Sequence, residues 1–239
     1  MTRKVSKDKM FEMTFDFLEK HKPCLSNQLN NMLKEERIIL LKDFGQPYNG
    51  KTISSTIKFS PYVIIYLLNN IIDVSTLIHE IGHVYQYQKQ EQHRYNQVYK
   101  SIYNNQLEVY SHYLELLSYD SFLDNFEKKD ILNLKRLMVK NFIENYINLE
   151  LYLNVFDKEN YYENYDEYSS DYSYARGMLL AFEFYHMYIK DKEKAEYNID
   201  RFITESGKYD FLTTINKYDL NREHLESGIA IKKYIKQIF

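Results

Sequence analysis

Most of the chain carries apolar residues at the spacing of amphipathic helices. Apolar residues that recur every three or four positions form one stripe along a helix, whereas strict alternation is typical of a strand. The helical spacing predicts helices at residues 6–20, 24–43, 73–91, 96–120, 127–156, 167–191, 193–206 and 221–237. The chain has only 6 Gly and 3 Pro, which also favours long helices over a fold with many turns.

One region departs from this helical pattern. Residues 44–50 are rich in turn-forming residues, residues 51–59 alternate and are rich in Thr, Ser and Ile, and residues 62–68 are apolar. Two β-favouring runs on either side of Ser60-Pro61 predict a small antiparallel β element near residues 51–68. We expect an extended substrate to lie along its edge by β-addition. The predicted fold class is therefore mainly α with this one small β element.

Length and composition narrow the class of protein. At 239 residues the chain suits one large domain or two tightly joined lobes, and we take 1–239 as a single domain. A net charge of −3 gives no reason to expect nucleic-acid binding. The most apolar run, residues 62–72, is too short to span a membrane. The single Cys24, which we expect to pack as a small apolar residue, excludes an internal disulfide and fits a reducing cytoplasm.

The most informative motif is His79-Glu80-Ile81-Gly82-His83, within one predicted helix. Residues four apart on a helix point the same way, so His79 and His83 present two imidazoles at a spacing that suits one tetrahedral zinc ion. Glu80 lies beside the open metal position, where a carboxylate can take a proton from metal-bound water. The alternative interpretation is a buried helix with two incidental histidines.

Other residues of these helices have candidate roles. Asp73 or Ser75 can cap the motif helix, and Asp73 is also a weaker candidate for a contact with a metal-binding histidine. A metallopeptidase needs a third protein ligand, and the next helical stretch carries Glu108 and Glu115 two turns apart on one face. A solvated helix carboxylate is the alternative interpretation of Glu108.

These motifs together resemble the catalytic core of the thimet oligopeptidase family, in particular its oligoendopeptidase F branch. The residues that carry the resemblance are Pro61-Tyr-Val-Ile-Ile, Asp73 to His83 with its HExGH pattern, and the E-x-x-S-x-x-x-E run from Glu108 to Glu115. The resemblance implies a zincin-like helical catalytic domain with one zinc ion per chain. It implies that Glu108 is the third zinc ligand, which the spacing also favours, and that Glu115 orients a zinc-binding imidazole.

A tyrosine-rich stretch extends the resemblance. Residues 168–177, YSSDYSYARG, resemble a family segment whose tyrosine donates a hydrogen bond to the oxyanion of the transition state. Aligned on Ala175 and Gly177, that role falls to Tyr174, while Tyr168 and Tyr172 are weaker candidates for substrate contact. The chain has 25 Tyr, so a tyrosine near any motif is also expected by chance.

The chain also departs from the family pattern. The family's usual histidine some ten residues before the oxyanion tyrosine is absent, and Gln86 stands where many members have another histidine. Neither position binds zinc, so metal binding should survive. The resemblance covers only the catalytic half of larger members, whose N-terminal lobe limits substrates to short peptides. We expect either a minimal member of the family or a chain that works with a partner chain or a second copy of itself.

The resulting hypothesis is a cytoplasmic zinc-dependent endopeptidase or oligopeptidase, with Glu80 and Tyr174 as catalytic residues and His79, His83 and Glu108 as metal ligands. Its substrates are peptides or proteins, with no nucleic-acid partner and no membrane span. One alternative is a catalytically impaired relative that binds peptides or other proteins. Another is a zinc hydrolase that acts on a non-peptide amide.

Overall fold

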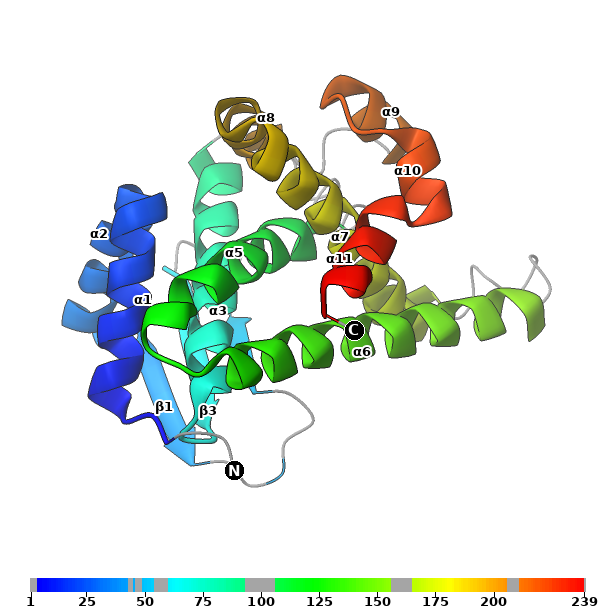
Figure 1. Cartoon of the computed structure of the whole chain (residues 1–239). Coiled ribbons are helices and arrows are strands. Elements are labelled where there is room, and N and C mark those ends of the chain that lie inside the picture. Colours follow the sequence, from blue (N-terminus) through cyan, green and yellow to red (C-terminus); the bar gives the residue numbers. More distant parts are fainter. Residues whose placement is uncertain are drawn as a thin grey trace. The chain divides into compact units, whose positions relative to one another are not determined.

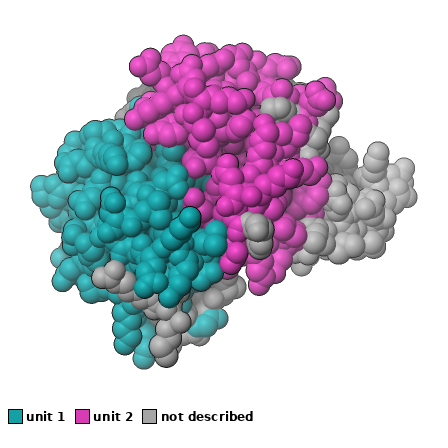
Figure 2. Space-filling model, in the orientation of Figure 1, with its two compact units in different colours: residues 1–89, 114–134 teal, residues 90–113, 135–239 magenta. Residues whose placement is uncertain are grey.

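The computed structural model describes residues 4–42, 45, 49–53, 60–92, 106–155, 165–205 and 211–238. By its internal contacts the chain divides into two compact units, residues 1–89 with 114–134 and residues 90–113 with 135–239 (Figure 2). The described part is mainly helical, as the sequence predicts, and contains one three-stranded sheet. Every described helix is too short or too polar to cross a bilayer.

The first unit begins with a pair of packed helices, α1 (Lys7–His21) and α2 (Pro23–Lys34) (Figure 1). Ser6 caps α1, because its hydroxyl accepts a hydrogen bond from the Lys9 amide, and Pro23 lies in the first turn of α2. Leu18, Leu25 and Leu29 of the two helices are fully buried. Cys24 is exposed, so its predicted packing is wrong: it lies on the outer side of α2 beside the buried Leu25.

The sheet has the order β1 (Ile38–Lys42), β3 (Tyr62–Leu67), β2 (Gly50–Ile53). Strand β2 pairs with β3 in antiparallel fashion, which confirms the predicted element where the two strands are described; residues 54–59 lie outside the described residues. Strand β1 pairs with β3 in parallel. The prediction of one helix over 24–43 is therefore wrong beyond Lys34.

The two faces of the sheet differ in burial. Val63 and Ile65 of β3 are fully buried, and their partners on β2 are Thr52 and Gly50, so these four residues share the inner face. The outer face carries apolar side chains that are about 40% exposed, among them Ile39 and Leu41 at 39% each. The inner face of β2 lies toward helix α3 (Ile71–Gln92), which follows β3 along the chain.

The remaining helices are α5 (Glu108–Ser121), the 3₁₀ turn η2 (Phe122–Asp124), α6 (Lys128–Val155), α7 (Tyr165–Lys190), α8 (Lys192–Glu205), α9 (Phe211–Lys217), α10 (Arg222–Ser227) and α11 (Ile229–Ile238). Helix α5 runs unbroken through the point where one unit ends and the other begins. The predicted helix 96–120 agrees with α5, although residues 93–105 lie outside the described residues. Helix α9 was not predicted, and the predicted helix 221–237 is interrupted at Gly228, whose φ is 61°.

The second unit has an aromatic core. The ring of Phe202 on α8 lies 5.5 Å from Phe184 of α7 and 5.6 Å from Tyr218, and Phe182 lies 5.1 Å from Tyr234 of α11. Edge-to-face and tilted ring pairs at these separations add stabilisation beyond the area they bury. These described Phe and Tyr residues therefore pack the helices of the second unit against one another.

One buried carboxyl of this unit predicts how stability depends on pH. Glu183 on α7 is 6% exposed, and burial raises the pKa of its carboxyl to about 7, although Lys190 and Lys233 oppose the shift. The folded state therefore keeps this proton to higher pH than the unfolded chain. Its stability should be greatest below the unfolded value of 4.5 and should fall as the pH rises from 4.5 to about 7.

Glu183→Gln, which is neutral at every pH, should remove that fall. We expect thermal unfolding at pH 8 to show the variant more stable than the wild type by roughly 1–2 kcal/mol, with no gain near pH 4.5. Glu205→Gln is the control, because the pKa of Glu205 is shifted in the opposite direction from that of Glu183. Burial alone would raise the pKa of Glu205, but hydrogen bonds from Lys217 and Tyr218 outweigh burial and lower it. Equal gains at pH 4.5 and pH 8 would contradict the assignment to Glu183.

Candidate metal centre

The turn between β3 and α3 fixes where the motif helix begins. Asn70, the residue before the helix, accepts a hydrogen bond from the Ile72 amide, at 2.8 Å. The two carboxylate oxygens of Asp73 accept the amides of Leu68 and Asn69, at 2.9 and 2.7 Å. Asp73 therefore ties the start of α3 to the end of β3, and the prediction that Asp73 or Ser75 caps the helix is wrong, because the helix begins at Ile71.

His79 and His83 lie one turn apart on α3, with their Nε2 atoms 3.0 Å from each other. Two imidazoles bound to one tetrahedral zinc ion at about 2.0–2.1 Å have nitrogens about 3.3 Å apart. The helix therefore holds the pair close to the separation that a shared zinc ion needs. This observation fits the metal that the motif predicts.

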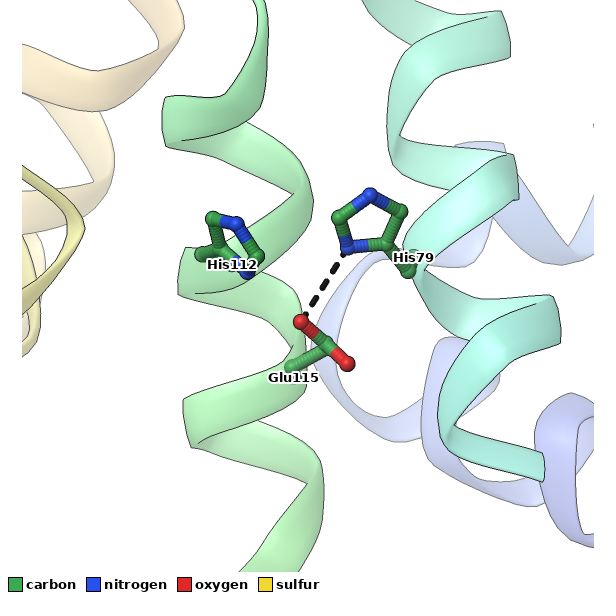
Figure 3. A group of neighbouring side chains, drawn as sticks. All are labelled: His79, His112 and Glu115. Atoms are coloured by element: carbon green, nitrogen blue, oxygen red, sulfur yellow. Dashed lines mark hydrogen bonds and ion pairs between the residues drawn. The ribbon is translucent and has the colours of Figure 1, made fainter. Parts of the chain in front are cut away.

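Glu115 of α5 fixes the other side of the His79 ring. Its Oε2 lies 3.1 Å from His79 Nδ1, and its Oε1 accepts a hydrogen bond from the Ser75 hydroxyl at 2.9 Å. Figure 3 shows this contact, with His112 one turn earlier on the same helix as Glu115. When Nδ1–H donates to a carboxylate, Nε2 keeps its lone pair for a metal. The structure thus places Glu115 at the position predicted for a residue that orients an imidazole.

Glu80, the predicted acid–base residue, is 5% exposed and faces strand β2. The hydroxyl of Thr52 lies 2.7 Å from Glu80 Oε2. Thr52 was not predicted, because this contact joins residues 28 positions apart and no local pattern indicates it.

Glu108 begins helix α5, two turns before Glu115 on the same face. Its side chain is 24% exposed, and its Oε2 lies 3.7 Å from Nε2 of the buried His112. His79, His83 and Glu115 belong to the first unit, whereas Glu108 and His112 belong to the second. Helix α5 is continuous, so it fixes the spacing between Glu108 and Glu115.

The second unit also places Tyr174 and Gly177 near these α5 residues. The ring of Tyr174 on α7 packs edge-to-face against His112, at 4.6 Å between centroids. A Cβ at Gly177 would lie 2.6 Å from the Cβ of Glu108, so only glycine lets α7 come this close to α5. The side chains of Tyr168 and Tyr172 lie outside the described residues.

His112 was not among the predicted site residues. It is 1% exposed and lies between the proposed ligand Glu108 and the proposed oxyanion donor Tyr174. The sequence pattern that could have indicated His112 is its position four residues after Glu108, which puts both residues on one face of α5.

Comparisons with known proteins show the fold. No family model matches the chain, and no curated protein sequence matches it. Among solved structures, a protein from Bacillus anthracis provisionally described as oligoendopeptidase F has a TM-score of 0.69 at 15% identity, covering 99% of this chain and 47% of its own. PZ peptidase A with an inhibitor has a TM-score of 0.70 at 14% identity, covering 99% of this chain and 49% of its own.

A third structure, from Chlamydophila abortus and provisionally described as a peptidase, has a TM-score of 0.65 at 15% identity and covers all of this chain. The chain spans about half the length of each of these structures. The predicted mainly α, peptidase-like fold is therefore confirmed: this chain shares its fold with about half of each of these structures.

Proposed function

We propose that this protein is a zinc-dependent endopeptidase or oligopeptidase that hydrolyses peptide bonds. The observation that carries the proposal is the arrangement of the ring nitrogens of His79 and His83. Their Nε2 atoms face each other at 3.0 Å, while Glu115 binds Nδ1 of His79. A buried helix with incidental histidines has no need of a carboxylate in that place. The shared fold with peptidase structures adds support.

In this proposal His79, His83 and Glu108 hold one zinc ion per chain, and Glu115 orients the His79 ring through its Nδ1 atom. Zinc in a site with an open position acidifies a bound water and polarises a carbonyl oxygen. Two imidazoles and one carboxylate are a donor set that zinc commonly uses for catalysis.

The protein's own groups supply the proton transfers. Glu80 takes a proton from the attacking water at its carboxylate and later gives it to the nitrogen of the leaving amine. Tyr174 donates its hydroxyl hydrogen to the former carbonyl oxygen as negative charge develops there. Strand β2 is an edge strand beside Glu80, so an extended peptide can pair with it and present its bonds to that carboxylate.

The decisive test compares peptide-library cleavage by wild type and Glu80→Gln, each with zinc content measured. Glu80→Gln should keep the metal and the fold, because Glu80 is not a ligand in this proposal. It should lose nearly all turnover, roughly 10²–10⁴-fold, because both proton transfers pass through that carboxylate. A zinc-loaded wild type that cleaves no peptide would overturn the proposal and favour a peptide-binding role.

Elemental analysis and chelator competition test the metal ligands. We expect His83→Ala to lose stoichiometric zinc, and Glu108→Ala to lower zinc affinity more than Glu115→Ala. Loss of a residue that only orients a ligand typically weakens affinity by about 10–100-fold, whereas loss of a direct ligand does more. His21→Ala, a histidine of α1, is the control and should keep full zinc. Release of the metal by His112→Ala rather than by His83→Ala would contradict the proposed ligands.

Gly177→Ala tests how Glu108 is held. Alanine favours a helix over glycine by about 1 kcal/mol, but its Cβ would lie 2.6 Å from the Cβ of Glu108, well inside ordinary contact. The overlap should displace Glu108, so we expect zinc affinity to fall about tenfold. Gly228→Ala is the matched control, because its φ of 61° makes alanine costly there without touching the site. A more stable Gly177→Ala with unchanged zinc affinity would show that α7 does not constrain Glu108.

A further inference from the structure

We propose that Thr52 on strand β2 is a positioning residue that holds the carboxylate of Glu80 in its working orientation. The inference rests on the proposed function, since it concerns the residue assigned there as acid and base. The assignment of Glu80 came from a sequence motif, whereas Thr52 is a strand residue that lies outside every motif of the sequence.

The first observation is the hydrogen bond itself. The Thr52 hydroxyl lies 2.7 Å from Glu80 Oε2 and 3.1 Å from the Glu80 backbone carbonyl oxygen, so the shorter contact is the one with the carboxylate. A hydrogen bond to an ionised carboxylate is about twice as strong as one between neutral groups. Glu80 is 5% exposed, so few water molecules compete with the hydroxyl for that oxygen.

The second observation is the room that β2 leaves on the other side of the carboxylate. Gly50 shares the inner face of β2 with Thr52, because their β3 partners are the buried Ile65 and Val63. A Cβ at Gly50 would lie 2.9 Å from Glu80 Oε1 and 2.5 Å from Thr76 Cγ2. The two inward residues of β2 thus fit the two oxygens of the Glu80 carboxylate. Gly50 leaves room for Oε1 because it has no side chain, and Thr52 offers a hydrogen-bond donor to Oε2.

This fit matters because a glutamate side chain is flexible. Fixing one costs rotamer entropy, which must otherwise be lost during each turnover. A carboxylate already fixed by the fold also needs no reorganisation at the moment of proton transfer. Thr52 therefore acts through Glu80, and its removal should affect turnover and leave substrate affinity and zinc binding alone.

The kinetic test uses Thr52→Val, which keeps the shape and removes the donor, and Thr52→Ser, which restores it. We expect Thr52→Val to lower kcat roughly 10–100-fold, with KM and zinc content within about twofold of wild type. Thr52→Ser should recover kcat to within about threefold. Thr204→Val, which removes another part-buried hydroxyl, is the matched control and should leave kcat unchanged. An unchanged kcat in Thr52→Val, a rise in KM alone, or no recovery by serine would overturn the proposal.

A second measurement does not depend on activity. Thermal unfolding of Thr52→Val, Glu80→Ala and the double variant forms a cycle, in which residues in contact give non-additive effects. We expect non-additivity here and additivity when Thr204→Val replaces Thr52→Val. Additive effects for Thr52 and Glu80 would sink the positioning role. If the wild type cleaves no peptide, the proposed function fails while this cycle still decides whether Thr52 holds Glu80.

Discussion

The contact between Glu115 and helix α3 is the constraint on which the candidate centre depends. One carboxylate oxygen faces His79 Nδ1 and the other accepts the Ser75 hydroxyl, so both acceptor sites bind one turn of α3. The contact holds the rotation of the His79 ring, and with it the direction in which Nε2 points. Helix α5 is unbroken from Glu108 to Glu115, so the spacing of these two carboxylates is set by the helix itself.

Local patterns of the sequence predicted what depends on helix geometry. The predicted helix 73–91 agrees with α3 within two residues, and the pairing of His79 with His83 follows from helical spacing alone. The prediction failed where distant partners decide the structure. Residues 38–42 read as the end of a helix, but Glu36 takes a φ of 54° and the chain then pairs in parallel with β3. The contact from Arg37 to the Pro61 carbonyl joins residues 24 positions apart, so no local pattern contains it.

The same distinction separates the predicted site residues from the missed ones. One pentapeptide contains His79, Glu80 and His83, and the role of Glu115 was predicted from the resemblance of the E-x-x-S-x-x-x-E run to a family pattern. Thr52 is on a strand of only four described residues, and its role depends on how that strand lies against α3. His112 is visible as a helix neighbour of Glu108, but its importance comes from burial and from the Tyr174 ring, which sequence spacing does not reveal.

The six glycines of the chain include two with an uncommon task. Gly50 leaves space for the carboxylate of Glu80, and Gly177 leaves space for the backbone and Cβ of Glu108. The proposed functions of Glu80 and Glu108 thus each depend on a neighbouring position that has no side chain. Positions 50 and 177 therefore leave little room for a side chain, although neither supplies a chemical group. A side chain at either position would displace a proposed carboxylate while every residue of the visible motif remained intact.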